Sequence, residues 1–333
     1  MEIVYVYPAT DTPVGGIKVA YRHAQSLTKA GFNATVFHPR APGFSCTWFD
    51  HSTLIRRHKR QHRIFDRKYR DLGAEFDASK DFLVIPEIWT PRYGENLINH
   101  GIRYAIFVQG GYLLDPEECS KDRRIQLAFK NASAVLVISE DTSNLIKLLF
   151  PELDSSKVFR VVPSIPYQPN PLQKDNLISF VARKAPHHAK MVEGILKERL
   201  PNKWSILNIV NVNEREMQNI LHRSKIFLSF GELEGLSLPP LEAALSGAFV
   251  VGYTGQGGKE YFNMPLFSEV EFGNIQDFVR STLNMVDNIE SLNFPHRTVE
   301  QQIRNLRQRY SEENESRLLK IFASEVVNRA GEN

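Results

Sequence analysis

Cysteine is scarce in this chain: only Cys46 and Cys119 occur among 333 residues, and no CxxC spacing is present. A disulfide scaffold and a cysteine-ligated zinc site are therefore both disfavoured. The chain also lacks an uninterrupted apolar run of about 18 residues, the length that a spanning helix needs. Its first residues, MEIVYVYPATDTP, contain no basic stretch followed by an apolar one. No secretory signal is therefore expected, and the cytoplasm is the expected location.

The charge of the chain is nearly balanced. Its 41 basic and 38 acidic residues leave a formal net charge of +3, which alone does not argue for nucleic-acid binding. Hydrophobic residues make up 42% and charged residues 24%, as in a folded globular protein. His187 and His188 are adjacent, and no carboxylate spacing completes a metal site around them. We therefore expect two domains and neither a metal nor another cofactor.

Short continuous runs rich in Val, Ile and Phe recur along the first half, separated by helical patterns. They read EIVYVYP, NATVFHP, DFLVIPE, RYAIFVQ, ASAVLVIS and VFRVVP. Continuous rather than alternating runs are typical of strands that are covered on both faces. Between the first two, IKVAYRHAQSLTKAGF has apolar residues at helical spacing, and Gly31 is placed to end that helix. This strand–helix–strand unit predicts a parallel sheet.

Four prolines between Pro163 and Pro171 indicate a linker, after which the pattern restarts. Apolar runs at NLISFVA, WSILNIV, KIFLSF and AFVVGY alternate with helical segments, and Asn213 with Glu216 predicts a capping box. The fold class is therefore α/β, with two Rossmann-like domains. The expected boundaries are 1–165 for an acceptor domain, 172–300 for a donor domain, and 301–333 for a charged helical segment that can cross back to the first domain.

Residues 54–70 read LIRRHKRQHRIFDRKYR and are dense in Arg, Lys and His. One interpretation is an ordinary solvated surface. The other is peripheral contact with anionic lipid on the inner membrane face, or with an anionic acceptor. Nucleic acid is disfavoured as a partner, because no known binding module accompanies the basic run.

Two glutamates in residues 231–247, GELEGLSLPPLEAALSG, have no cation within four residues. A carboxylate close to a core is costly unless it finds a partner. The stretch follows an apolar run, so it is expected at the carboxyl edge of the second sheet, where open α/β folds bind ligands. Gly235 allows a turn, and Pro239 and Pro240 are expected to begin a helix.

Because prolines donate no hydrogen bond, the free N–H groups here would be those of Leu236, Ser237 and Leu238. Together with the helix dipole, they form a pocket for phosphate oxygens. Glu242, expected in the first helical turn, and Glu234, before the turn, would flank that pocket and accept sugar hydroxyls. A nucleotide sugar suits such a site. The alternative is that Glu242 only stabilises its own helix and that Glu234 faces solvent.

The stretch FGELEGLSLPPLEAALSGAFVVGY, followed by GQGGKEYF, resembles the donor-binding signature of retaining glycosyltransferases of family 4. The resemblance spans about thirty residues. It implies the GT-B fold, in which the parallel sheets of two Rossmann-like domains face each other across a cleft. It further implies that Glu234 contacts the donor sugar and that Glu242 binds the ribose hydroxyls. Leu236 and Ser237 depart from the family, which usually has Phe-Gly there.

Other residues fall where this family would need them. Arg183 and Lys184 resemble the basic pair that neutralises the leaving diphosphate, with Lys190 as a substitute for the second cation. The glycine pair Gly15–Gly16 resembles the pair that approaches the donor phosphates. Gly257 and Gly258 suggest a loop over the donor, and a plain turn is the competing reading. On the acceptor or sugar side the resemblance places Gln109, Gly110 and Gly111.

The resemblance implies transfer of a sugar from a nucleoside diphosphate sugar to a hydroxyl of a saccharide or lipid-linked acceptor, with retention, in cell-surface polysaccharide assembly. Arg183, Lys184 and Glu234 would be the catalytic residues. Two alternatives remain: a nucleotide-sugar epimerase of the same fold and a non-catalytic scaffold. A dinucleotide-dependent oxidoreductase is disfavoured, because the chain has no GxGxxG fingerprint after its first strand.

Overall fold

The computed structural model describes residues 1–12, 14–49, 51–58, 71–167, 174–291 and 295–331. The chain divides into two compact units. The first comprises Met1–Pro163 with Glu313–Asn333, and the second comprises Ser164–Glu312. The sequence pattern suggests a boundary at residue 301, whereas the structure divides after Glu312, because the helix over 296–309 packs within the second unit. Each unit contains one parallel sheet.

The first unit is built on a six-stranded parallel sheet with the order β2-β1-β3-β4-β5-β6. Its strands are β1 (Glu2–Val6), β2 (Asn33–Phe37), β3 (Asp81–Pro86), β4 (Arg103–Val108), β5 (Ala134–Val137) and β6 (Val158–Arg160). Each apolar run predicted in the first half forms one of these strands, which confirms the predicted parallel sheet. The strand order reverses at β1, so the carboxyl ends of β1 and β3 mark the place where such sheets bind ligands.

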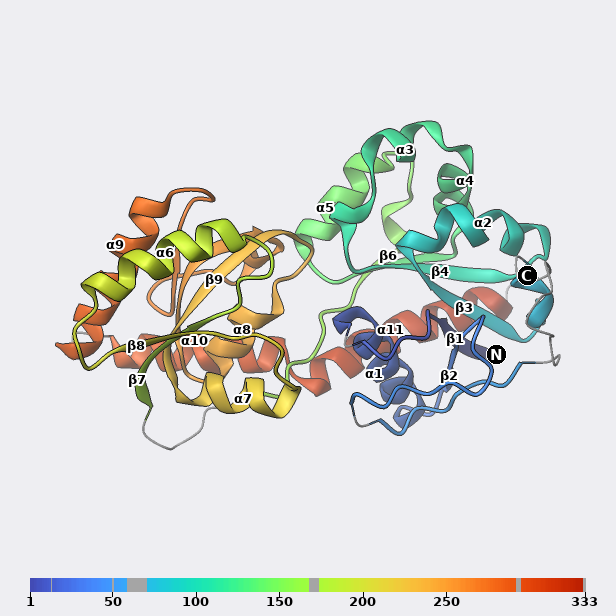
Figure 1. Cartoon of the computed structure of the whole chain (residues 1–333). Helices are drawn as coiled ribbons and strands as arrows, with labels where there is room; N and C mark the ends of the chain where they lie inside the picture. Colours follow the sequence, from blue (N-terminus) through green and yellow to red (C-terminus); the bar gives the residue numbers. More distant parts are fainter. Residues whose placement is uncertain (13, 50, 59–70, 168–173, 292–294, 332–333) are drawn as a thin grey trace. The chain divides into compact units, whose positions relative to one another are not determined.

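Helices cover both faces of this sheet (Figure 1). They are α1 (Gly15–Lys29), α2 (Thr90–Asn99), α3 (Pro116–Lys121), α4 (Arg123–Asn131), α5 (Glu140–Leu149) and α11 (Glu312–Gly331), with short 3-10 turns η2 (Gly73–Glu75), η3 (Glu87–Trp89), η4 (Gly111–Leu113) and η5 (Ser155–Lys157). As predicted, α1 stops just before Gly31, whose φ of +90° an L side chain rarely adopts.

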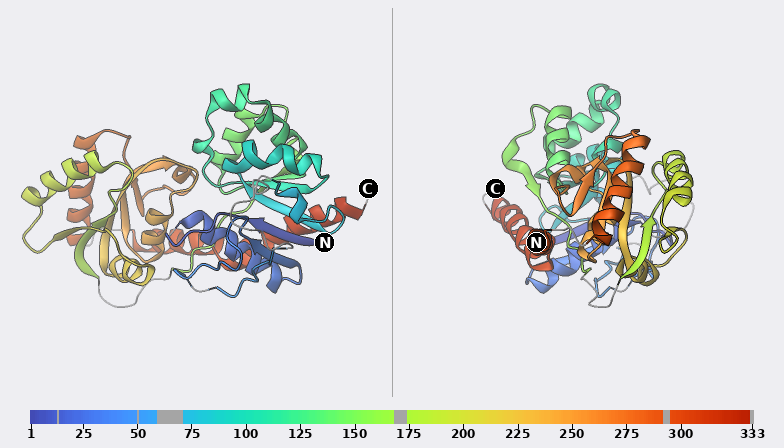
Figure 2. Two further views of the ribbon diagram at one scale, coloured as in Figure 1. Left: turned by 45° about the vertical axis from the view of Figure 1, so that its right-hand side comes forward. Right: turned by 90° about the vertical axis from the view of Figure 1, so that its left-hand side faces the viewer.

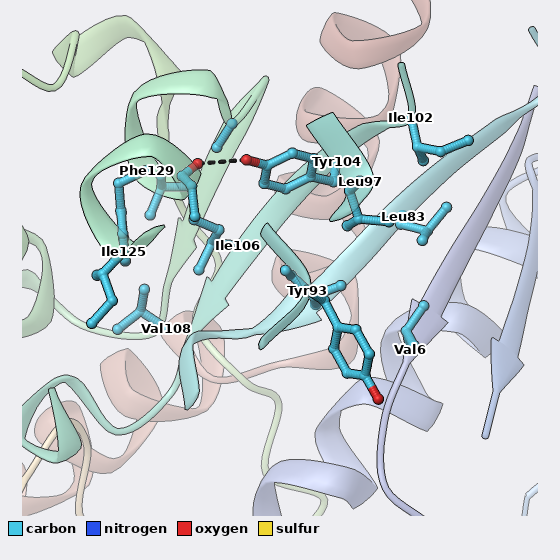
Figure 3. Packing of buried hydrophobic residues seen from close by; sticks show 14 of the residues in the cluster. Val6, Leu83, Tyr93, Leu97, Ile102, Tyr104, Ile106, Val108, Ile125 and Phe129 are labelled. Atoms are coloured by element: carbon cyan, nitrogen blue, oxygen red, sulfur yellow. Dashed lines mark hydrogen bonds between the residues drawn. The ribbon is translucent and has the colours of Figure 1, made fainter. Parts of the chain in front are cut away.

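One face of the sheet packs against α2, α4 and α5. Alternate strand residues such as Leu83, Ile106 and Val108 point to this side, where they meet Tyr93 of α2 and Phe129 of α4 (Figure 3). Figure 3 also shows the buried hydroxyl of Tyr104 donating to the carbonyl oxygen of residue 128, 2.7 Å away. The core therefore forms on the period-two alternation of the strands.

The opposite face of the sheet is covered by α1 and α11. Figure 2 shows that α11, the C-terminal helix, lies beside the N-terminal segment of the chain. Phe322 of α11 packs edge-on against Phe82 of β3, with ring centroids 6.1 Å apart. On α1, His23 is fully buried and stacks on the ring of Phe107. Its Nε2 lies 3.4 Å from Oε1 of Glu315, a buried carboxylate of α11. The last helix of the chain is thus part of the first unit's core.

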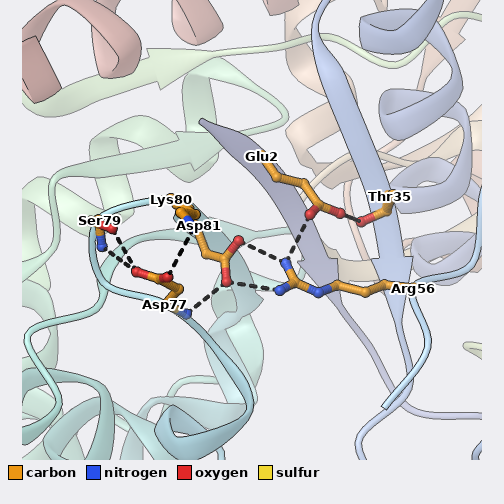
Figure 4. Close-up of polar contacts among 7 residues, drawn as sticks. All are labelled: Glu2, Thr35, Arg56, Asp77, Ser79, Lys80 and Asp81. Atoms are coloured by element: carbon orange, nitrogen blue, oxygen red, sulfur yellow. Dashed lines mark hydrogen bonds and ion pairs between the residues drawn. The ribbon is translucent and has the colours of Figure 1, made fainter. Parts of the chain in front are cut away.

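The start of the basic 54–70 run is anchored inside the first unit (Figure 4). The Arg56 guanidinium makes two 2.8 Å hydrogen bonds to the Asp81 carboxylate and a third, of 3.0 Å, to Glu2. Asp81 is buried, and a paired bidentate geometry is the form in which arginine stabilises such a group. Arg56 is therefore a structural cation rather than part of a solvated face, and residues 59–70 lie outside the described part of the chain.

The second unit is built on a five-stranded parallel sheet with the order β11-β10-β9-β7-β8. Its strands are β7 (Asp175–Phe180), β8 (Ser205–Asn208), β9 (Ser224–Glu234), β10 (Phe249–Gln256) and β11 (Phe267–Glu269). Its helices are α6 (Pro186–Arg199), α7 (Glu214–Arg223), α8 (Leu238–Leu245), α9 (Ile275–Glu290) and α10 (His296–Arg309), with the 3-10 turn η6 (Gly257–Glu260). The predicted capping box of Asn213 and Glu216 opens α7.

Helices α6 and α9 pack on one face of this sheet, and α7, α8 and α10 lie on the other (Figure 1). Lys174 immediately precedes β7. Its Nζ donates hydrogen bonds to the carbonyl oxygens of Leu221, His222 and Ser224 at the end of α7. It satisfies carbonyl groups that a helix end leaves without intrahelical partners. In the part of the chain that the structure describes, no helix has both the length and the apolar character needed to cross a membrane.

Candidate functional site

The candidate donor site lies at the carboxyl edge of the second sheet, where β9 leads into α8. Strand β9 does not end with the apolar run KIFLSF at Phe230 but continues to Glu234, because its last residues pair with β10 through Glu234 and Gln256. Helix α8 then begins at Leu238, one residue before the expected Pro239. As a result Glu242 lies in the second helical turn, and the expectation that it sits in the first turn is wrong.

Four of the predicted residues line one small hollow of about 60 Å³: Arg183, Lys184, Glu234 and Ser237. The first two follow β7, Glu234 ends β9, and Ser237 lies in the turn between β9 and α8. Nζ of Lys184 lies 3.6 Å from Oε1 of Glu234, with side chains 40% and 17% exposed. The hollow therefore joins two cations and a partly buried carboxylate beside a helix N-terminus, at the edge where parallel sheets hold ligands.

The turn between β9 and α8 presents backbone to this hollow. Gly235, Leu236 and Ser237 are buried, and Ser237 precedes the helix without capping it through its side chain. Because Leu238 is the first helical residue, its N–H has no acceptor within the helix. The next two positions are proline and have no N–H to satisfy. Of the first three residues of α8, only Leu238 therefore has an N–H group. This N-terminus lies beside Arg183 and Lys184.

Residues 255–260, which we call the glycine loop, pack directly on that turn. A Cβ on Gly257 would lie 1.9 Å from the carbonyl oxygen of Gly235, so no larger residue fits there. Gly258 is less crowded, with the Tyr261 hydroxyl 3.2 Å from an added Cβ. The hydroxyl of Tyr261 also donates to the carbonyl oxygen of Ser237. The glycine loop and the β9–α8 turn thus form one continuous surface.

The glutamates around this surface affect the pKa values of two buried tyrosines, Tyr261 and Tyr167. Burial first, then Tyr310, and then the carboxylates of Glu234, Glu260 and Glu242 hold the pKa of Tyr261 well above its usual value. Burial, with Glu242 as the next cause, likewise raises the pKa of Tyr167. Glu242 is half-buried on α8. The two glutamates of the motif therefore lie around the same buried tyrosine, Tyr261, which no local pattern singles out.

The last residue of the glycine loop is held from α10. Oε1 of Glu260 accepts hydrogen bonds from Nη2 of Arg309, at 2.8 Å, and from the hydroxyl of Tyr310, at 2.9 Å. Nη1 of Arg309 also donates to the backbone oxygen of Glu260. The Glu260 side chain is only 6% exposed, so this is a buried, charge-assisted contact.

Apart from Lys190, which lies on α6, the remaining predicted residues gather at the carboxyl edge of the first sheet. Gly15 and Gly16 open α1, whose N-cap Val14 offers no side-chain acceptor. A Cβ on Gly16 would lie 2.7 Å from Oε1 of Gln109, and Nε2 of Gln109 donates to the oxygen of Gly16 at 3.0 Å. The Tyr7 hydroxyl donates to the same amide. The Gln109 side chain, expected to face substrate, thus fixes the start of α1 to the end of β4.

A carboxylate buried beneath this edge orders the turn after β4. Glu87 is 3% exposed, and its Oε1 accepts from the N–H of Gly110 at 2.7 Å. Burial raises the pKa of Glu87 above its usual value, while the hydrogen bond from Gly110 opposes this. Gly111 begins η4 and packs against α5, where an added Cβ would contact Leu145. The contacts of Glu87 are those of a structural residue.

The predicted site residues thus form two clusters, one in each unit. Among the residues that the structure describes, no three His, Cys, Asp or Glu side chains gather as a metal site would require. Of the adjacent histidines, His188 contacts the Tyr253 hydroxyl through Nδ1, at 3.1 Å. Neither Arg309 nor Tyr310 was singled out from the sequence, because no local pattern links them to a loop some fifty residues earlier.

Neither a protein-family model nor a curated protein matches the chain. Solved structures do match it. A glycosyltransferase from Rickettsia africae ESF-5 is 13% identical with a TM-score of 0.68, and the match covers 98% of each chain. The HepE protein of Anabaena, solved with UDP-glucose, is 11% identical with a TM-score of 0.69, over 97% of this chain and 99% of its own.

The lipopolysaccharide outer core galactosyltransferase WaaB, solved without ligand, is 12% identical with a TM-score of 0.64, over 99% of this chain and 100% of its own. At these identities the likeness concerns the fold. The similar structures match almost end to end, and both sheets of this chain, of six and five strands, are parallel. The chain therefore has the α/β GT-B fold of glycosyltransferases.

Proposed function

We propose that this protein is a glycosyltransferase that moves a sugar from a nucleoside diphosphate sugar to an acceptor hydroxyl. The observation that carries the proposal is the hollow in the second unit, where Arg183 and Lys184 meet Glu234 and the start of α8. Cations and helix amides bind diphosphate oxygens, and a carboxylate accepts hydroxyl hydrogen bonds. Both chemistries are needed for a ligand that joins a sugar to a pyrophosphate.

In this proposal Arg183 and Lys184 bind the diphosphate, and Glu234 accepts from hydroxyls of the transferred sugar. Glu242 accepts from the ribose, and the glycine loop with Gly257 and Gly258 closes the donor site. In the free protein Lys184 is paired with Glu234. Donor binding would give each partner a new contact: a phosphate oxygen for the ammonium and a sugar hydroxyl for the carboxylate.

During transfer the sugar carries oxocarbenium character while negative charge grows on the departing diphosphate. Arg183, Lys184 and the amide of Leu238 would stabilise that charge. We further propose that the reaction retains configuration, with the leaving phosphate accepting the proton of the acceptor hydroxyl on the same face. The Glu87 carboxylate beneath the acceptor edge is 3% exposed, and its Oε1 already accepts from the N–H of Gly110. It is a poor candidate for a base.

The first unit would bind the acceptor at the edge that carries the 109–111 turn, while Gly15 and Gly16 at the start of α1 remain the predicted pair for the donor phosphates. A saccharide or lipid-linked acceptor, used in cell-surface polysaccharide assembly, is the class that we propose. The structural similarity to an outer core galactosyltransferase of lipopolysaccharide supports this choice. Peripheral contact with anionic lipid through 54–70 would bring the protein to such an acceptor. Of that segment, Arg56 is excluded from lipid contact by its pairing with Asp81.

The proposal is tested by incubating the purified protein with UDP-, GDP- and dTDP-sugars, with and without saccharide and lipid-linked acceptors. We expect one donor to give a new glycoside, whose anomeric configuration by NMR matches that of the donor. A changed sugar in the absence of acceptor would instead identify an epimerase. Binding of no nucleotide sugar in a thermal-shift screen would contradict the proposal, and an inverted product would contradict retention alone.

A further inference from the structure

We propose that Glu260 is a positioning residue of the donor site, which fixes the glycine loop to the end of α10 and so to the segments through which the chain enters and leaves the second unit. The inference rests on the proposed function for the statement that this loop contacts a donor. It assigns Glu260 no contact with the donor itself.

The first step is that the glycine loop cannot move independently of Glu234. Gln256 pairs with Glu234 across the β9–β10 ladder, and Gly257 touches the backbone of Gly235 so closely that a Cβ has no room. Gln256 also has a φ of +69°, uncommon for a residue with a side chain. A loop of this shape persists only when surrounding contacts hold it in place.

The second step is that Glu260 supplies such contacts. One oxygen of its carboxylate accepts both the Arg309 guanidinium and the Tyr310 hydroxyl, and Arg309 also donates to its backbone oxygen. All three hydrogen bonds are between 2.8 and 3.1 Å. Removing the carboxylate would leave the guanidinium and the hydroxyl without this acceptor, so the loop and α10 would separate more easily.

Helix α10 ends close to the start of the second unit. The carbonyl oxygen of Tyr310 accepts a 2.9 Å hydrogen bond from the N–H of Ile165. The second unit begins at Ser164 and ends at Glu312. The segment by which the chain enters the second unit and the segment by which it leaves therefore meet at this hydrogen bond. Ile165 directly follows the first boundary residue, Ser164, and Tyr310 lies two residues before the last, Glu312. Through Tyr310, a single carboxylate connects the glycine loop with both segments.

Through this connection, donor binding affects the two segments by which the chain enters and leaves the second unit. A donor that orders the glycine loop also orders Glu260, and Glu260 in turn orders Arg309, Tyr310 and the Ile165 hydrogen bond. The reverse holds by linkage: a more ordered segment favours donor binding by the same factor. Glu260 thus acts on the reaction through the loop that it holds.

The experiment compares Glu260→Ala, Glu260→Gln and Tyr310→Phe with the wild-type protein. Glu315→Gln is the matched control, because it removes another buried carboxylate, in the first unit, that faces His23. Donor affinity is measured by calorimetry with UDP-glucose, or with whichever donor the wild-type protein uses. We expect Glu260→Ala to raise the donor Kd at least tenfold, with Glu260→Gln and Tyr310→Phe giving smaller increases. The acceptor KM should change less than twofold in each.

Hydrogen–deuterium exchange of the free proteins supplies a readout that needs no donor. Glu260→Ala should speed exchange in the glycine loop and at the Ile165 amide, whereas Glu315→Gln should change neither. Unchanged exchange at both places would overturn the inference even if melting temperature falls. If the wild-type protein binds no nucleotide sugar, the proposed function fails, while the exchange data still decide whether Glu260 positions the loop. Normal donor affinity in Glu260→Ala would overturn the link to donor binding alone.

Discussion

Lys184 and Glu234 are ion-paired in the free protein, with Nζ and Oε1 3.6 Å apart. Both side chains remain partly exposed, so the pair is screened by water and is worth little as a stabilising contact. Its significance is chemical: it keeps an ammonium and a carboxylate at one hollow without leaving either unpaired. A ligand that offers an anion to one partner and hydroxyl groups to the other can replace the pair at low cost.

Replacing Glu242 by alanine should weaken donor binding. The carboxylate would lose hydrogen bonds to the ribose, each worth roughly 1.5–3 kcal/mol when one partner is charged, so the donor Kd should rise roughly 10- to 100-fold. Calorimetric titration with the donor measures it. Glu232→Ala, which removes an exposed carboxylate from the preceding strand β9, is the control and should leave Kd unchanged. Equal affinity in Glu242→Ala and wild type would refute the ribose assignment.

Replacing Arg183 by alanine should act mainly on turnover. If its charge stabilises the departing diphosphate more than the bound donor, kcat should fall by roughly 10²- to 10³-fold, with a smaller change in donor Kd. Steady-state kinetics at saturating donor separate the two effects. Lys184→Ala and Lys190→Ala should be measured in parallel, because they decide which lysine supplies the second cation. A loss confined to Lys190→Ala would move the cationic pair away from Lys184.

Replacing Gly257 by alanine should destabilise the second unit and disturb the glycine loop. The new methyl group would lie 1.9 Å from the oxygen of Gly235, so backbone must shift at a cost of about 1–3 kcal/mol. Gly194→Ala is the matched control: it lies inside α6, nothing is within 4 Å of an added Cβ, and it should stabilise by about 0.5–1 kcal/mol. Urea denaturation of the three proteins measures both shifts. A neutral Gly257→Ala would contradict the described packing.

The stability of the protein should rise with pH above neutrality through Lys174. Burial lowers the pKa of Lys174 to about 8 from its ordinary value of 10.5. Between those two values the unfolded chain holds more protons than the folded one, so the free energy of unfolding increases with pH there. Allowing for partial exposure of the side chain, we expect a gain of about 1–2 kcal/mol.

The measurement for Lys174 is denaturant unfolding between pH 7.5 and 10.5, in wild type and in Lys174→Met. The variant leaves three carbonyl oxygens without their donor and should be less stable at pH 7.5 by about 1–3 kcal/mol. The difference between the two proteins should grow as pH rises. A difference that stays constant would show that Lys174 does not titrate in this range.

The fold was largely predictable because its strands are short, continuous apolar runs, which only a two-sided sheet can bury. The capping box of Asn213 and Glu216 was predictable for the same reason of locality: both partners lie within one helical turn. The extension of β9 to Glu234 was not, because it depends on pairing with Gln256 of another strand. That pairing also determines the orientation in which Glu234 meets Lys184.

The site was predictable as a set of chain positions and less so as a set of contacts. Arg56 lies in a run of cations, but its partners Asp81 and Glu2 are 25 and 54 positions away, beyond any sequence window. Gln109 suggested a group that faces substrate, whereas its amide is used to join Gly16 and Tyr7. In each case the contacts of the side chain come from partners far away in the sequence, which no local pattern reveals.

The return of α11 to the first unit sets the order in which the two units can be completed during synthesis. The second unit is one uninterrupted segment, Ser164–Glu312, so it can fold as soon as it has left the ribosome. The first unit has all six strands by then, but the face that receives Phe322 and Glu315 is still uncovered. The half of the protein that is translated first is therefore the half that reaches its native state last.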